Sequence, residues 1–306
     1  MPSAARPSCF PPVDDSFETP AIADAIVETI QRHGFCIARG VADAARVNRV
    51  SEELTPWFDA TPFAQGPFYG DRTVRFHAAL NKSQACHALV LDPVVRDVCD
   101  ALLGPYCDWM QLNLTQGLAI HPGAPAQPPH RDQNMWHGAR YTHPFVINVM
   151  WCLDRFTPEN GSTVFWPGSH RATSSAWLPD DQAVQATAEP GDVIFWLGET
   201  LHGGGANTTS APRRGFLTSY CLGWLKTYEN MFLTYPPEIA AGFSPELQAL
   251  IGYRIHRPNL GGYEGQSPAI LLDSGERPTR LGAIDYLLPE QLAMIDQINS
   301  RQEAAA

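Results

Sequence analysis

Three side chains suited to bind a metal ion stand out in the sequence. His130 and Asp132 form a His-x-Asp triplet, and His202 lies further along the chain in the string LHGGGAN. Two imidazoles and one carboxylate can occupy one face of a divalent metal and leave the opposite positions open, which is the ligand set of non-haem Fe(II) oxygenases. These residues predict an iron site with room for dioxygen and a co-substrate.

The spacing of these residues indicates which elements must carry them. His130 and Asp132 are two residues apart, so they project to the same side if they lie on a strand, and His202 must come from a neighbouring strand. Arg213 and Arg214 follow at the start of another β-rich run. A guanidinium there would bind a carboxylate beside the metal in a bidentate manner. Only one of the two should point inward, because adjacent strand residues face opposite ways, and the sequence leaves open which one.

The context of the triplet strengthens the metal-site interpretation. A His-x-Asp triplet alone occurs by chance in many chains, and the sequence contains eight other histidines. However, His130 follows the proline-rich stretch HPGAPAQPP, and this places it at an irregular rim, where functional groups gather more often than within a core.

Composition favours an enzyme with one catalytic domain that spans residues 1–306. The chain is 44% hydrophobic and 17% charged, as in globular proteins, and no apolar stretch is long enough for a membrane span. The net charge of −11 would repel nucleic acid and acidic membranes, so we expect a small-molecule substrate instead. The same charge weighs mildly against a polyanionic coenzyme A thioester.

Cysteine usage and the N-terminus favour a cytoplasmic, soluble protein. The seven cysteines are an odd number and include no Cys-x-x-Cys pair, so they suggest neither a disulfide framework nor a zinc-thiolate site. The start MPSAARPSCFPP lacks the charged and apolar regions of a secretory signal.

The first 106 residues are expected to be rich in helices. Thr19 would cap a helix with Pro20 in its first turn, and Gly34 would end it before the strand-like FCIA. The apolar stripe of this helix would be Ile22, Ile26 and Ile30. A second helix is predicted over 43–56, and a third begins at Asp92 and Pro93 and ends before Gly104.

Residues 107–226 are typical of a β core that holds the metal site. FVINVMWCL, STVFW, DVIFW and GFLTSYCLGW are short β-branched and aromatic runs between Pro/Gly-rich turns, a pattern that suggests a sandwich or barrel. Residues 227–306 contain helix-like SPELQALIGY and PEQLAMIDQINSRQ. This last part would cover the active-site mouth or form a subunit contact in a homodimer, and the sequence does not decide between them.

Four segments between residues 127 and 215 resemble the phytanoyl-CoA dioxygenase family of Fe(II)/2-oxoglutarate-dependent oxygenases, and its secondary-metabolite branch in particular. They are HRDQ, ENGSTVFWPGSH, EPGDVIFW and LHGGGANTTSAPRRG. The resemblance implies a mainly β fold with flanking helices, with a double-stranded β-helix (jelly-roll, cupin-like) core.

The resemblance also implies roles for individual residues. Iron would be bound by His130, Asp132 and His202, and an arginine of the pair Arg213 and Arg214 would hold the distal carboxylate of 2-oxoglutarate. Further contacts to 2-oxoglutarate would come from Gln127, Thr163 and Arg72, although Arg75 is close enough in sequence to be confused with Arg72.

The reaction implied by this family consumes 2-oxoglutarate and O2, releases succinate and CO2, and oxidises an unactivated C–H bond. Hydroxylation is the default, with desaturation or rearrangement as variants, because the carboxylate of Asp132 occupies the place where halogenating relatives leave space for halide. We expect a mid-sized, mostly apolar natural product as substrate. The alternatives are a lipid or acyl-CoA substrate, a non-catalytic metal-binding protein of the same fold, and a cupin-like hydrolase or isomerase.

Overall fold

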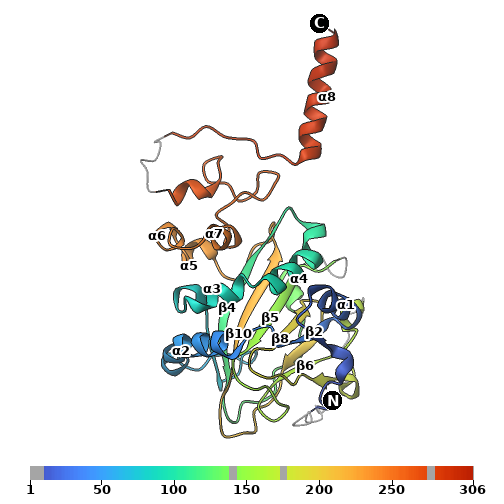
Figure 1. Ribbon diagram of the computed structural model, residues 1–306, viewed down its shortest axis with the longest axis vertical. Coiled ribbons are helices and arrows are strands. Elements are labelled where there is room, and N and C mark those ends of the chain that lie inside the picture. The colour runs from blue at the N-terminus through green and yellow to red at the C-terminus, as the bar shows by residue number, and fades with distance from the viewer. Residues whose placement is uncertain (1–9, 138–142, 173–177, 274–279, 306) are drawn as a thin grey trace.

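Two β-sheets form the centre of the computed structural model, which describes residues 10–137, 143–172, 178–273 and 280–305 (Figure 1). The large sheet has the strand order β1-β2-β8-β5-β10-β4-β3. Its strands are β1 (Glu18–Pro20), β2 (Phe35–Arg39), β3 (Thr73–Phe76), β4 (Met110–Ile120), β5 (Val146–Cys152), β8 (Val193–Leu197) and β10 (Arg213–Leu222). The small sheet has the order β7-β6-β9, with β6 (Thr163–Phe165), β7 (Val184–Gln185) and β9 (His202–Gly204).

The two sheets face each other and enclose an aromatic core. Phe35 of β2 stacks on Phe165 of β6 with ring centroids 4.3 Å apart, and Trp196 of β8 meets the same Phe165 ring at 5.8 Å. All described strand pairs are antiparallel except β1 with β2. This sandwich of two antiparallel sheets is the jelly roll that the sequence predicted.

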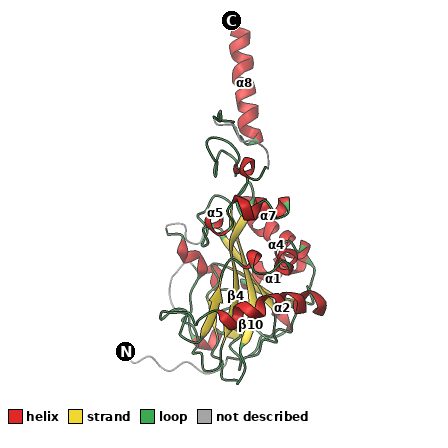
Figure 2. Ribbon diagram, turned by 90° about the vertical axis from the view of Figure 1, so that its left-hand side faces the viewer, coloured by secondary structure: helices red, strands yellow, loops and turns green. Residues whose placement is uncertain are grey.

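Helices cover the outer face of the large sheet, and Figure 2 shows α1, α2 and α4 on the same side of the strands. The helices before β4 are α1 (Ala23–His33), α2 (Ala44–Ala60), α3 (Ala85–Val90) and α4 (Pro93–Leu103). Short 3-10 helices lie at Asp15–Phe17, Ala79–Asn81, Gly104–Tyr106, Asp132–Met135, Ser169–Arg171, Asp180–Gln182 and Pro268–Leu271.

The predicted start of the first helix is wrong. Thr19 and Pro20 lie in β1, where Thr19 pairs with Ala38 of β2, and the helix begins at Ala23 without a side-chain cap. Ile22 is 57% exposed, whereas Ile26 and Ile30 are fully buried. The pairing of residues 18–20 with β2 outweighs the tendency of Thr19 and Pro20 to begin a helix. The predicted end at Gly34 is confirmed, because this residue adopts the left-handed conformation (φ 87°) that glycine tolerates best.

The other two N-terminal helices follow the prediction closely. Asp43 caps α2 by accepting from the backbone N–H of Arg46, but the helix continues through Pro56 to Ala60, beyond the predicted end at 56. Asp92 caps α4, and Pro93 occupies its first turn. The same N-terminal part also supplies three strands of the large sheet, namely β1, β2 and β3.

Alternation along the strands divides the large sheet into an outer face and a face turned to the small sheet. In β3, Val74 and Phe76 pack with the helices, whereas Arg75 points to the other side. Arg75 stands opposite Leu118 of β4, which also faces the small sheet. The inner face therefore carries the polar side chains that build the cavity described below.

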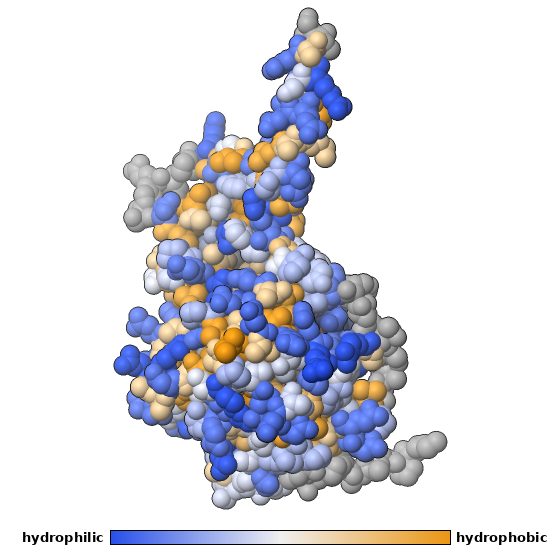
Figure 3. All heavy atoms as spheres, turned by 45° about the vertical axis from the view of Figure 1, so that its right-hand side comes forward, coloured by the Kyte–Doolittle hydropathy of each residue, from blue (hydrophilic) through white to orange (hydrophobic). Residues whose placement is uncertain are grey.

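The C-terminal part packs against the main core at its start and then extends away from it. It contains α5 (Met231–Thr234), α6 (Pro237–Ala240), α7 (Pro245–Leu250) and α8 (Pro289–Ala305). Figures 1 and 3 show α8 standing clear of the body, and its apolar residues Leu292, Met294 and Ile295 are 42–60% exposed. Among the described residues, no helix has the length and apolar character needed to cross a membrane. A homodimer that uses this arm stays a prediction.

Candidate active site

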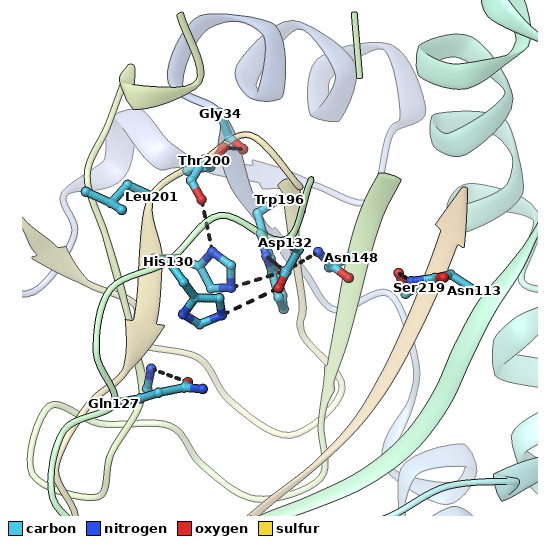
Figure 4. A network of polar contacts seen from close by, with 12 residues as sticks. Gly34, Asn113, Gln127, His130, Asp132, Asn148, Trp196, Thr200, Leu201 and Ser219 are labelled. Carbon is cyan, nitrogen blue, oxygen red and sulfur yellow. Dashed lines mark hydrogen bonds and ion pairs between the residues drawn. The ribbon is translucent and has the colours of Figure 1, made fainter. Parts of the chain in front are cut away.

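The three predicted metal ligands converge at one edge of the small sheet. The backbones of His130 and His202 form an isolated bridge, with N–H to O distances of 2.8 and 3.0 Å in the two directions. The Nε2 atom of His130 lies 3.4 Å from Oδ1 of Asp132, and Nε2 of His202 lies 3.3 Å from Oδ2. Each residue offers one ligand atom, and these atoms lie within 4.8 Å of one another (Figure 4).

The triplet departs from the regular strand that its spacing suggested. His130 pairs with β9, but Asp132 begins the 3-10 helix Asp132–Met135, and Arg131 between them is extended. The turn swings the carboxylate towards the imidazoles, so the convergence depends on a local bend as well as on strand alternation.

Backbone carbonyls hold both imidazoles in the orientation that a metal needs. Nδ1 of His130 lies 3.0 Å from the carbonyl of Pro128, and Nδ1 of His202 lies 3.0 Å from the carbonyl of Thr200. A carbonyl can only accept, so the Nδ1 atoms carry the protons and the Nε2 lone pairs face the centre. The donor set therefore fits a divalent metal before any metal binds.

Two side chains orient the carboxylate of Asp132. Asn148 of β5 donates from Nδ2 to Oδ2 at 2.8 Å, and Trp196 of β8 donates from Nε1 to the same oxygen at 3.4 Å (Figure 4). Burial alone would raise the pKa of Asp132, but the neighbouring His202 and His130 hold it well below its ordinary value. Asp132 is therefore an ionised ligand at neutral pH. Sequence reasoning missed Asn148, although an asparagine within the apolar run FVINVMWCL was a visible signal.

A buried clamp joins the turn that carries Asp132 to the turn that precedes His202. Arg131 donates from Nε to the carbonyl of Glu199 at 2.9 Å, and Gln133 donates from Nε2 to Oε1 of Glu199 at 3.0 Å. The backbone N–H of Gln133 also reaches the carbonyl of Gly198 at 3.0 Å. All three side chains are less than 7% exposed. The clamp sets the distance between the two turns.

Replacing Gln133 by leucine is expected to weaken Fe(II) binding about 10-fold, the lower end for loss of an outer-shell partner. Glu199→Gln is the matched control, because its amide oxygen can still accept from Gln133 and should leave the affinity near wild type. Anaerobic Fe(II) titration followed by calorimetry measures both. Unchanged affinity in Gln133→Leu would show that the clamp does not position the ligands.

The metal-binding cluster lies in a cavity of about 430 Å³ between the two sheets. Gln127 and Thr163 both line it, as predicted from the resemblance. Oε1 of Gln127 accepts from the backbone N–H of Gly204 at 3.2 Å, and Thr163 stands opposite Gly204 in the β6–β9 pair. Both residues are thus held close to the strand that carries His202.

Arg213 faces the cavity and Arg214 does not. Arg213 is 1% exposed and donates from Nη2 to the carbonyl of Gly161 at 2.5 Å, but its buried Nε and Nη1 atoms have no hydrogen-bond partner within the described part of the chain. Burial lowers its pKa to about 10, so it stays charged at neutral pH. Arg214 instead forms a two-point pair with Asp154, at 2.9 and 3.0 Å. Of the two arginines that the sequence left open, Arg213 is therefore the one that faces the cavity.

Arg75, not Arg72, reaches the cavity. Arg72 precedes β3 and is exposed, and its Nη1 lies 3.4 Å from the carbonyl of Pro122. Arg75 lies within β3 and donates from Nη1 to Oε1 of Gln116 at 3.2 Å, while its buried Nε is unpartnered. Arg72 precedes the strand and does not line the cavity, whereas Arg75 faces it because it alternates with Val74 and Phe76, which pack with the helices.

Comparisons with known proteins decide the family. The model of the family described as phytanoyl-CoA dioxygenase (PhyH) matches residues 30–215. The chain belongs to this family. It is a dioxygenase of the iron- and 2-oxoglutarate-dependent class, as the sequence resemblance predicted.

Several relatives of this dioxygenase come from fungi. The chain is 30% identical over 268 residues to dioxygenase FrzG of Cladobotryum sp, which covers 78% of this chain and 87% of the relative. It is 28% identical over 245 residues to dioxygenase cdmA of Talaromyces verruculosus, with coverage of 75% and 82%. Both are fungal dioxygenases, so the match to the secondary-metabolite branch that the sequence suggested is confirmed.

A solved structure supports the fold independently. The epimerase SnoN, crystallised with Fe3+, alpha ketoglutarate and nogalamycin RO, superposes with a TM-score of 0.55 at 19% identity and covers 87% of this chain and 96% of SnoN. At this identity the likeness concerns the jelly-roll fold alone.

Proposed function

We propose that this dioxygenase uses Fe(II) and 2-oxoglutarate to oxidise an unactivated C–H bond of a mid-sized, mostly apolar natural product, with release of succinate and CO2. Hydroxylation is the default outcome, and desaturation or rearrangement are its variants. The observation that carries the proposal is that a preformed metal-ligand cluster shares one cavity with Arg75 and Arg213, each of which keeps a buried guanidinium nitrogen without a hydrogen-bond partner among the described residues.

The residues that would hold the metal are His130, Asp132 and His202. Ferrous iron bound there would supply the redox chemistry through which dioxygen is reduced at the expense of 2-oxoglutarate and the substrate. The protein orients the reactants and excludes water. Because backbone carbonyls accept hydrogen bonds from Nδ1 of both histidines, their Nε2 atoms are left to bind the metal.

Two arginines suit the two carboxylates of 2-oxoglutarate. Arg213 would bind the distal carboxylate with its free Nε and Nη1, since a buried guanidinium without an anion is costly. Arg75 would bind near the metal end, where burial lowers its pKa and the charge of the nearby Asp132 opposes that change. Gln127, which lies beside β9, and Thr163 of β6 would complete the contacts.

The rest of the cavity favours an uncharged, apolar substrate. Its lining away from the arginines includes Phe68, Leu114, Met135 and Leu217, and Asp132 is the only acidic residue among the described lining residues. A volume of about 430 Å³ is within the range of small-molecule sites, roughly 300 to 1,000 Å³. The described lining contains no lysine, and this weighs against an acyl-CoA with its phosphates.

Succinate formation tests this proposal against its alternatives. Under air, the enzyme with Fe(II) and 2-oxoglutarate should release succinate slowly when no substrate is present. With a correct substrate the release should be at least about 10-fold faster, because substrate binding couples decarboxylation to productive oxidation. A panel should include neutral terpenoids and polyketides beside acyl-CoA thioesters. Stimulation by a thioester only would establish the runner-up. Tight Fe(II) and 2-oxoglutarate binding without any succinate would indicate the non-catalytic alternative.

A further inference from the structure

Two tyrosine hydroxyls meet at the opening of the cavity. Tyr69 Oη and Tyr228 Oη lie 2.5 Å apart, and both residues line the cavity. Tyr69 precedes β3 and Tyr228 follows β10, so the hydrogen bond joins segments 159 residues apart in the chain. Tyr228 is 44% exposed, which places the pair where the cavity meets solvent.

The hydroxyl pair keeps one donor unused. Each phenol carries one proton, and the bond between the two oxygens uses one of the two protons. In the part of the chain that the structure describes, neither hydroxyl has a second hydrogen-bond partner. Burial raises the pKa of Tyr228, so it remains protonated at neutral pH. The second proton is therefore available to a bound molecule.

Both rings are held in place by contacts other than the bond between their hydroxyls. The guanidinium of Arg75 lies 4.7 Å from the ring centroid of Tyr69. The Tyr228 ring stacks on His77 with centroids 5.3 Å apart, and its backbone N–H donates to Oδ1 of Asn113 at 2.7 Å. Because both rings are already held in place, a hydrogen bond from their hydroxyls to a bound molecule costs little conformational entropy of the protein.

The surroundings of the pair are apolar on the side of the metal ligands. Phe68, which precedes Tyr69, packs edge-on to the His130 ring with centroids 4.7 Å apart. Leu114 and Met135 also line the cavity. These apolar side chains line the same cavity as the two tyrosines and His130.

We propose that Tyr69 and Tyr228 together form a neutral hydrogen-bond donor that binds one uncharged oxygen of the substrate, a carbonyl, hydroxyl or ether. This rests on the proposed function, and it narrows the substrate class to a neutral, already oxygenated hydrocarbon skeleton. A neutral donor suits a neutral acceptor, whereas an anion would be drawn to an arginine. The reaction that supplies the substrate must then either add this oxygen to the hydrocarbon skeleton or keep an oxygen that the building blocks of the skeleton already carry.

The competing role is a latch that only ties the two segments together. The two roles differ in their response to substitution. Either Tyr69→Phe or Tyr228→Phe breaks the bond between the hydroxyls, so a latch is lost fully in each single variant. A donor to the substrate survives in each single variant, because one hydroxyl remains, and disappears only in the double variant.

A fluorescent ketone makes this difference measurable without the natural substrate. The probe is 6-propionyl-2-(dimethylamino)naphthalene, whose emission moves to longer wavelength when its carbonyl accepts a hydrogen bond. The control is 2-(dimethylamino)naphthalene, which lacks the carbonyl. Both are titrated into the full chain, with and without Fe(II) and 2-oxoglutarate under anaerobic conditions. Leu217→Trp, which fills the cavity, should abolish binding of both.

We expect the ketone to bind about 10-fold more weakly to the double variant than to either single variant, with emission at shorter wavelength, since one hydrogen bond to a neutral group is lost. The control naphthalene should change less than about twofold. Equal losses in single and double variants, equal losses for ketone and control, or no cavity binding of the ketone to wild type would each overturn the proposal. Probe binding needs no metal, so failure of the iron site would appear separately, in the Fe(II) titration.

Discussion

His202→Ala is expected to abolish the weak visible absorption that appears when Fe(II) and 2-oxoglutarate are added anaerobically to the protein. Iron affinity should fall by more than about 100-fold, because outer-shell partners alone are worth about 10- to 100-fold and His202 would be a direct ligand. The bridge between the backbones of His130 and His202 does not involve the imidazole, so the fold should survive the substitution.

The matched control for this variant is His137→Ala. His137 is an exposed histidine seven residues after His130 and lies outside the cavity lining. The His137→Ala variant should show both the absorption band and succinate release at wild-type levels. A band that persists in His202→Ala would refute the proposed ligand set, and loss of the band in both variants would point to a general effect of histidine removal.

Arg213→Gln is expected to weaken 2-oxoglutarate binding by about 100- to 1,000-fold while Fe(II) affinity stays within about threefold. Two charge-assisted hydrogen bonds from a buried guanidinium to a carboxylate would be lost, each worth roughly 1.5 to 3 kcal/mol. The measurement is the dependence of the visible band, and of succinate release, on 2-oxoglutarate concentration.

Arg214→Gln provides the adjacent control. Its ion pair with Asp154 is 27–28% exposed on both sides, and such pairs contribute at most about 1 kcal/mol to stability. We therefore expect a small drop in thermal stability and nearly unchanged 2-oxoglutarate affinity. If Arg214→Gln carries the larger affinity loss, the assignment of Arg213 to the co-substrate is wrong.

Arg213 and Arg214 show that the position of a residue along a strand decides which way its side chain points. They are neighbours in β10, and Arg213 stands opposite Ile120 of β4, whose side chain also lines the cavity. The next residue must face the helices, where Asp154 and Thr55 receive its guanidinium. One residue of register thus separates the proposed co-substrate contact, Arg213, from the ion pair of Arg214.

Residue types and short motifs predicted the family and most of the elements that build the core. They also suggested the three iron ligands as a hypothesis. The ligands were recognisable because His130, Asp132 and His202 lie in short segments whose residue types the chemistry itself requires. The apolar runs of β5, β6, β8 and β10 were recognisable because they alternate with Pro/Gly turns. In contrast, β4 was not singled out, since polar residues such as Asn113 and Gln116 interrupt its apolar pattern.

The positions of these polar side chains could be known only from the folded structure. Asn113 and Gln116 face a cavity rather than solvent, and Asn148 reaches Asp132 across the sheet. The choice of Arg75 over Arg72 and the meeting of Tyr69 with Tyr228 likewise depend on strand register and on segments far apart in the chain. Residue type and spacing determine which chemistry is possible, whereas long-range strand pairing determines which side chains share the cavity, because a pleated strand turns each successive residue to the opposite face.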